Sequence, residues 1–76
     1  MSQFEDFKKK HLQYLAKAAL LNNQIGRDKK LLEEVRRFIP ELQAFLNENK
    51  RKLDQKKAAE LIAWRNRWIE LTAEYR

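Results

Sequence analysis

Turn-forming residues are almost absent from this chain, and that shortage limits its fold more than any other feature. The sequence holds one glycine, Gly26, and one proline, Pro40, among 76 residues. A β-sheet needs frequent turns, which glycine and proline usually form, whereas a few long helices need only a few turns. The chain also has no cysteine and a single histidine, so we expect neither disulfides nor a metal ion to stabilise it. The sequence therefore predicts one all-α domain spanning residues 1–76.

The last stretch of the chain, residues 58–75, has the broadest apolar surface. At helical spacing, one stripe is formed by Leu61, Trp64, Trp68, Leu71 and Tyr75, and a second by Ala58, Ile62, Ile69 and Ala73. On a helical wheel the two stripes together span roughly 200°. A single neighbouring helix cannot cover an arc of this width. We expect this segment to pack against two helices of its own chain or to offer part of its apolar face to a partner.

Capping signals divide the chain into three antiparallel helices, at about 3–23, 28–48 and 54–75. Ser2 and Glu5 have the spacing of a capping box, and Asp28 and Asp54 are suitable N-caps for the later helices. Gly26 is expected to take the left-handed conformation that ends the first helix. These signals predict a small three-helix bundle.

Pro40 allows a second architecture. In the bundle, it lies inside the second helix on the side opposite the apolar arc, where it produces a solvent-facing kink at a cost of ~3 kcal/mol. Alternatively, Pro40 is the first residue of a new helix. The chain would then form a long hairpin that turns at Pro40 and continues as one C-terminal helix. We prefer the bundle because the apolar phase is preserved across Pro40 and rotates between Leu53 and Leu61.

The chain is basic, with 17 Lys and Arg against 11 Asp and Glu and a formal charge of +6. This charge favours nucleic acid, acidic proteins or anionic lipid as partners. The densest positive run comprises Lys50, Arg51, Lys52, Lys56 and Lys57. This run has two interpretations. It is either a phosphate-binding patch or a solvated surface without a binding role. No apolar run is long enough for a membrane span or a secretory signal, which favours a cytoplasmic protein.

Residues for catalysis are scarce, so we expect no enzymatic activity, no cofactor, no metal and no small-molecule substrate. A nucleophile needs a neighbouring base, and the only imidazole is His11, which lies between Phe7 and Tyr14 on an apolar face. We interpret His11 as a boundary residue of the core. Phosphate-binding loops need several glycines, and this chain has only Gly26.

Two classes of function remain. The first is a small interaction module, such as an adaptor, assembly factor or inhibitor, that binds a protein partner or a second copy of itself. Its candidate interface residues are Leu61, Trp64, Arg65, Trp68 and Tyr75. Equally, the tryptophans have ordinary core periodicity, and Arg65 lies between the two stripes, where it needs a carboxylate or water. The second class is a nucleic-acid-binding accessory protein that uses the Lys50–Lys57 run for phosphates and the Arg-flanked tryptophans for bases.

Overall fold

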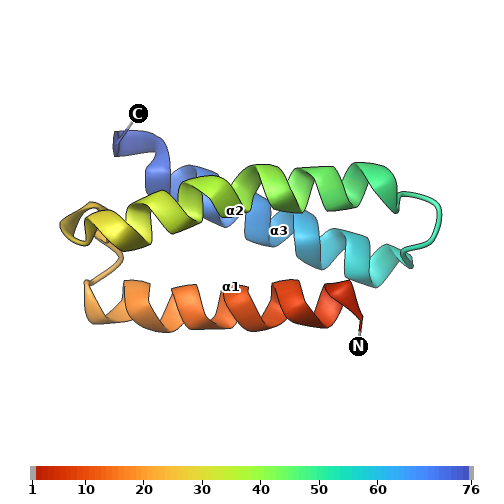
Figure 1. The fold of residues 1–76 in the computed structure, drawn as a ribbon, viewed down its shortest axis with the longest axis horizontal. Coiled ribbons are helices and arrows are strands. Elements are labelled where there is room, and N and C mark those ends of the chain that lie inside the picture. Colours follow the sequence, from red (N-terminus) through yellow and green to blue (C-terminus); the bar gives the residue numbers. More distant parts are fainter. Residues whose placement is uncertain (1, 76) are drawn as a thin grey trace.

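A computed structural model, which describes residues 2–75, folds as a three-helix bundle with extents of 37 × 23 × 17 Å. The helices are α1 (Gln3–Leu20), α2 (Lys29–Glu48) and α3 (Gln55–Thr72); a short 3-10 helix, η1 (Ile25–Arg27), precedes α2, and another, η2 (Ala73–Tyr75), follows α3. The helices run up, down and up, so that α1 and α3 are parallel and both are antiparallel to α2 (Figure 1). The three-helix prediction is therefore confirmed.

The start of each helix is capped by the side chain that the sequence predicted. The hydroxyl of Ser2 accepts a hydrogen bond from the Glu5 amide at 3.2 Å. Oδ1 of Asp28 accepts from the amides of the first turn of α2, and Oδ1 of Asp54 accepts from the Lys57 amide at 2.8 Å. These oxygens satisfy amides that have no partner inside a helix, and such a cap contributes about 1 kcal/mol.

The end of α1 differs from the prediction. The left-handed residues are Asn22 and Asn23, with φ of 53° and 64°, and Gly26 has no positive φ. The Asn23 amide donates to the Ala18 carbonyl at 2.7 Å and the Asn22 amide to the Ala19 carbonyl at 3.1 Å. This is a Schellman motif, with asparagine at the position that glycine usually fills. The helix therefore ends at Leu20, earlier than the predicted Asn23.

Gly26 has a different role. A Cβ atom added at Gly26 would lie 2.6 Å from Cδ1 of Tyr75, well inside contact distance. The absence of a side chain thus lets the ring of Tyr75 lie against the connection between α1 and α2. The contact explains why a glycine suits this position even though its backbone is not left-handed.

Pro40 lies within α2, and the helix continues through it to Glu48. Its side chain is exposed, as the preserved apolar phase predicted. The alternative hairpin is excluded, because α2 ends at Glu48 and residues 49–54 form a separate connection before α3. The side-chain amide of Asn49 donates to the Phe45 carbonyl at 3.0 Å and closes the end of α2.

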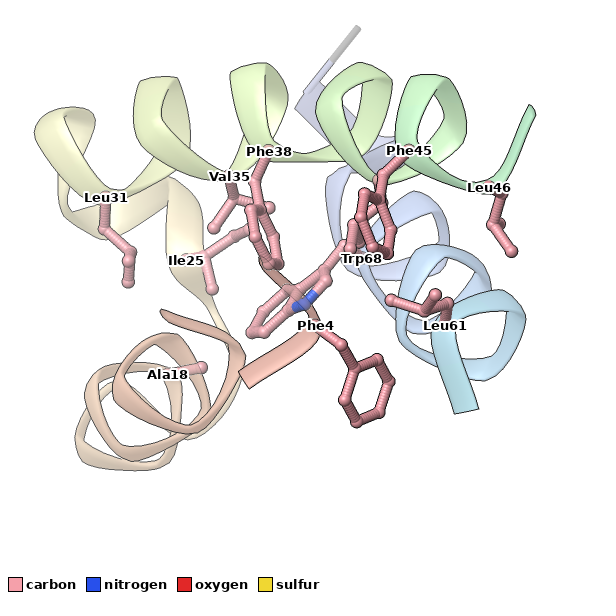
Figure 2. Packing of buried hydrophobic residues seen from close by; sticks show 11 residues of the cluster. Phe4, Ala18, Ile25, Leu31, Val35, Phe38, Phe45, Leu46, Leu61 and Trp68 are labelled. Carbon is pink, nitrogen blue, oxygen red and sulfur yellow. The ribbon is translucent and has the colours of Figure 1, made fainter. Parts of the chain in front are cut away.

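The core is built from all three helices and η1. Its most deeply buried large side chains are Trp68, Phe38, Ile25, Leu31, Leu42, Leu61 and Val35. Trp68 lies at the centre, between the residues that α1 and α2 contribute (Figure 2). Aromatic contacts attach α1 to both neighbours, with Phe7 4.9 Å from Phe45 and Tyr14 6.1 Å from Trp68 between ring centroids. Such pairs add about 0.5–1.5 kcal/mol beyond the area that they bury.

Candidate protein-binding groove

Most of the predicted interface residues of α3 are used inside the bundle. Leu61 and Trp68 are 0% exposed, so they have no surface to offer a partner in this conformation. Trp64 is half-buried and stacks between His11 and Phe4, with ring centroids 4.7 Å and 5.5 Å away. Tyr75 and Leu71 are half-buried as well. The tryptophan stripe therefore faces the core, as its ordinary core periodicity predicted.

His11 is also a core residue, and its partner is Trp68. It is 6% exposed, and its Nδ1 atom accepts a hydrogen bond of 3.0 Å from Nε1 of Trp68. Burial, together with the nearby positive charge of Arg67, lowers the pKa of His11 from 6.5 to about 4. The imidazole is thus neutral near pH 7, with its proton on Nε2. Within residues 2–75, no group of three or more His, Cys, Asp or Glu side chains is arranged to hold a metal ion.

Arg65, another of the predicted interface residues, forms its side-chain hydrogen bonds with amides and not with carboxylates. Its guanidinium donates to Oε1 of Gln43 on α2 and, at 3.0 Å, to Oδ1 of Asn66. Both acceptors are neutral amides. Among residues 2–75 the one side-chain ion pair joins Lys10 to Glu41, at 3.8 Å, and Arg65 has no carboxylate partner there. Arg65 is only partly buried, and its hydrogen bond to Asn66 lies on the exposed side, so neutral amides and solvent accommodate its charge.

A groove runs between α2 and α3 beside Arg65. It has a volume of about 300 Å³. Its apolar lining consists of Leu46, Leu53, Ala58 and Ile62, and its polar lining of Gln43, Asn47, Lys50 and Arg65. Ile62 is 40% exposed and is one of three large apolar side chains that the described residues leave open to solvent. The groove therefore combines an apolar surface with polar groups at its edge.

The charges around this groove all have one sign. Lys50 and Arg65 are its only charged lining residues, and both are positive. By contrast, a hollow between α1 and α2 is lined by Asp6, Lys10 and Glu41, which include both signs. Like charges that share a low-dielectric concavity reinforce one another and attract an anion. The α2–α3 groove thus suits an acidic, partly apolar ligand.

The predicted phosphate-binding residues lie next to this groove. Lys50, Arg51, Lys52, Lys56 and Lys57 are all exposed, on residues 49–54 and the first turn of α3. Asp54, the one acid within this run, is occupied as the cap of α3. Nζ of Lys57 lies 5.3 Å from the centre of the Phe4 ring, which places the N-terminus of α1 at the same end of the bundle (Figure 1). The structure therefore gathers the positive run at one end.

The sequence carried only part of the signal for the groove. The width of the apolar arc indicated that part of residues 58–75 would lie beyond what one neighbouring helix covers, but it did not indicate that this part would be Ala58 and Ile62. Leu46, Leu53 and Gln43, however, come from α2 and the connection, and no sequence spacing relates them to Ile62. Their place in the groove depends on how α3 is rotated against α2.

Comparison with protein-family models, with curated proteins and with solved structures found no match to this chain. Among residues 2–75, no helix combines the length and the apolar character that crossing a bilayer requires.

Proposed function

We propose that this protein is a small helical interaction module that binds a protein partner in the α2–α3 groove. The observation that carries the proposal is the pairing of an exposed apolar side chain, Ile62, with a half-buried guanidinium, Arg65, that has no carboxylate within the described residues. A partner that supplies an apolar side chain and an acid would satisfy both. An adaptor, an assembly factor or an inhibitor would work in this way, without catalysing a reaction.

The partner segment best matched to this surface is an amphipathic helix with acidic residues beside its apolar face. In helix-in-groove recognition, apolar anchors supply affinity and charged residues at the edge set the register. Burial of apolar groups against Ile62, Leu53 and Leu46 would supply about 25 cal/mol per Å² of area removed from water. A carboxylate on Arg65 would accept two parallel hydrogen bonds, and hydrogen bonds to charged groups contribute about 1.5–3 kcal/mol each.

Titration with designed peptides tests this proposal. The probe is an amphipathic helical peptide with glutamates beside its apolar face, and its matched control keeps the apolar face but replaces every glutamate with lysine. We expect the acidic peptide to shift the backbone amide resonances of Leu53, Ile62 and Arg65, and the basic peptide to leave them unchanged. Equal shifts with both peptides, or shifts confined to other residues, would contradict the proposal.

Two substitutions then identify the surface. Ile62→Asp and Arg65→Glu should each abolish binding of the acidic peptide, because one removes the apolar contact and the other repels the carboxylate. Ala63→Glu is the control, because Ala63 is exposed on α3 but does not line the groove. Retained binding in either groove variant would exclude this site.

A second candidate function is nucleic-acid binding through the five exposed cations of residues 50–57. It is favoured by their clustering at one end and by the occupation of Asp54 as a helix cap. Each phosphate contact releases counterions, so affinity for nucleic acid should fall steeply with salt.

Fluorescence anisotropy with generic DNA and RNA across a salt series tests this second candidate. The variant Lys50→Gln/Arg51→Gln/Lys52→Gln should lose binding. A control with the same loss of charge, Arg27→Gln/Lys29→Gln/Lys30→Gln, should keep it, because those side chains are exposed where α2 begins, at the opposite end of the bundle (Figure 1). If both variants lose affinity for nucleic acid equally, the binding depends on net charge and not on the proposed patch, which would contradict this candidate function.

A further inference from the structure

The outer face of α3 carries an apolar stripe that is interrupted by one asparagine, and we call this stripe the α3 seam. It consists of Ala59, Ile62, Asn66, Ile69 and Ala73. Ile69 is partly exposed and the other four side chains are exposed. The first four residues lie inside α3, and Ala73 continues the helix with φ of −56° and ψ of −38°. The seam is thus a continuous helical surface that faces solvent.

The spacing of the α3 seam is that of a coiled coil. Its members are separated by alternating steps of three and four residues, which is the a/d pattern of the heptad abcdefg. Ile62 and Ile69 take the d positions, and Asn66 takes the a position between them. A single asparagine at an a position specifies the register of a helix pair. The seam therefore has the features of a surface that pairs with a second helix.

The residues that border the seam are complementary in charge between two copies of α3. Arg65 takes a g position and Glu70 the next e position, five residues later, and both lie inside α3. In a parallel pair, a g residue faces this e residue of the other helix, so Arg65 meets the partner subunit's Glu70. The two-fold axis forms this contact twice. In an antiparallel pair, g faces g, and the two Arg65 side chains would repel each other.

We propose that α3 of a second copy of this chain docks along the α3 edge of the α2–α3 groove, in a parallel pair with the two-fold axis beside Asn66. This inference rests on the proposed function, because it names the partner of the same groove. Ile62 lies in the α3 seam and also lines the groove, as Arg65 does at its edge. The second copy brings an apolar stripe to Ile62 and a carboxylate to Arg65.

Arg65 can bind this carboxylate and keep the hydrogen bonds within its own chain. A guanidinium has five N–H donors. The bonds to Oε1 of Gln43 and to Oδ1 of Asn66 use three of the five, one each from Nη1, Nε and Nη2, which leaves two. The partner subunit's Glu70 can therefore be accommodated without the loss of these contacts.

The pair should be weak and reversible. The α3 seam spans about two heptads, whereas a stable isolated coiled coil needs about three or four. The bundle, however, has already formed α3, so pairing does not have to nucleate a helix. We expect a dissociation constant between ~10 μM and ~1 mM.

A charge exchange between two variants tests the contact of Arg65 with the partner subunit's Glu70. In sedimentation velocity up to ~1 mM, the parent chain should show a monomer–dimer equilibrium. Arg65→Glu and Glu70→Arg should each raise the dissociation constant at least ~10-fold, because each replaces two attractions by two repulsions. An equimolar mixture of the two variants should form a heterodimer as readily as the parent forms its dimer, because each variant supplies the charge that the other needs.

The control for this exchange is Arg67→Glu, which makes the same change of charge at an exposed position of α3 outside the seam. It should dimerise like the parent. Circular dichroism should show the same helix content in all of these variants. A mixture of Arg65→Glu and Glu70→Arg that associates no better than either variant alone would overturn the proposal.

Cysteine cross-linking tests the parallel direction with a substitution that barely alters the fold. The chain has no cysteine, and Ala59→Cys introduces one thiol at an end of the seam. A parallel pair brings the two thiols together, whereas an antiparallel pair about Asn66 separates them by about 21 Å along the helix. We expect a disulfide-linked dimer under mild oxidation. The matched control, Ala16→Cys, is an exposed alanine of α1 and should remain monomeric. Equal cross-linking at positions 16 and 59, or none at position 59, would refute the parallel pair.

The self-pairing and the proposed function fail in different ways. A chain that is monomeric at ~1 mM but whose groove resonances shift with the acidic peptide would exclude the self-pairing and keep the proposed function. A chain that dimerises and exchanges charges as expected, but whose groove resonances do not respond to the peptide, would support the self-pairing and contradict recognition of other acidic helices.

Discussion

The indole Nε1 of Trp68 donates a hydrogen bond of 3.0 Å to Nδ1 of His11, which precedes it by 57 residues. The bond joins the first helix to the last inside the core, where His11 is 6% exposed and Trp68 is fully buried. It requires an unprotonated Nδ1, because a protonated imidazole has only donors. The only histidine of the chain is therefore held neutral by its surroundings.

This bond predicts that the protein loses stability in mild acid. The pKa of His11 is lowered from 6.5 to about 4 in the folded protein, so the unfolded chain binds a proton first as the pH falls. The free energy of unfolding should decrease between pH 6.5 and pH 4, by on the order of 3 kcal/mol in total. Urea denaturation at a series of pH values measures this decrease.

The control for the acid effect is His11→Gln, whose amide oxygen can still accept a hydrogen bond from Trp68 but does not titrate. Its stability should change far less over the same pH window. A decrease of equal size in the variant would assign the acid effect to the carboxylates instead.

The two tryptophans should differ in their access to solvent. Trp68 is fully buried, whereas Trp64 is half-buried and stacks between Phe4 and His11. Two variants each leave a single tryptophan: Trp64→Phe leaves Trp68, and Trp68→Phe leaves Trp64. We expect the acrylamide quenching constant of Trp68 in the first variant to be several-fold smaller than that of Trp64 in the second. Similar quenching constants in the two variants would show that the core does not enclose Trp68.

Gly26 and Tyr75 should be energetically coupled. The methyl group of Gly26→Ala would overlap the ring of Tyr75, and such overpacking typically lowers the free energy of unfolding by about 1–3 kcal/mol. In the background Tyr75→Ala, the same substitution should become neutral or stabilise the protein by about 0.4–1 kcal/mol, because alanine restricts the unfolded chain. A double-mutant cycle measured by thermal unfolding gives the coupling energy. A Gly26→Ala cost that is independent of Tyr75 would contradict the contact.

Pro40→Ala should stabilise the protein. Pro40 is exposed within α2, so its ring makes no core contact that alanine would lose, and alanine restores the missing amide donor in the middle of the helix. Interior proline costs ~3 kcal/mol, and its restriction of the unfolded chain offsets about 1 kcal/mol of that cost. We therefore expect a gain of about 2 kcal/mol in urea denaturation. A loss of stability would mean that the proline shapes the helix in a way that the bundle needs.

The sequence predicted the helices well because their determinants are local. The caps Ser2, Asp28 and Asp54 act on amides within three residues, and the apolar phase that crosses Pro40 belongs to a single helix. The end of α1 was predicted less accurately, since either Asn22 or Gly26 could take the left-handed conformation. Gly26 packs against Tyr75 instead, a residue that is distant in the sequence and that no local pattern could relate to it.

The site was less predictable than the fold because it depends on contacts between helices. Periodicity showed that α3 has more apolar surface than one neighbour covers, but it could not show which stripe faces inward. The tryptophan stripe is buried, and the stripe of Ala58 and Ile62 borders the groove. The sequence did not predict the hydrogen bond between His11 and Trp68. Its apolar neighbours indicated only that His11 would lie at the edge of the core.

The 57-residue separation between His11 and Trp68 also bears on the order in which the bundle assembles. Helices α2 and α3 are joined by a short connection, so bringing them together closes a small loop at little entropic cost. Docking α1 on α3 closes a far longer loop. The connection between α1 and α2, residues 21–28, is nearly as short as that between α2 and α3, so loop closure favours both hairpins over direct docking of α1 on α3. We therefore expect the contacts between α1 and α3, including the bond between His11 and Trp68, to form last and to open first, so that the Trp68 indole N–H exchanges with solvent before the backbone amides of the core.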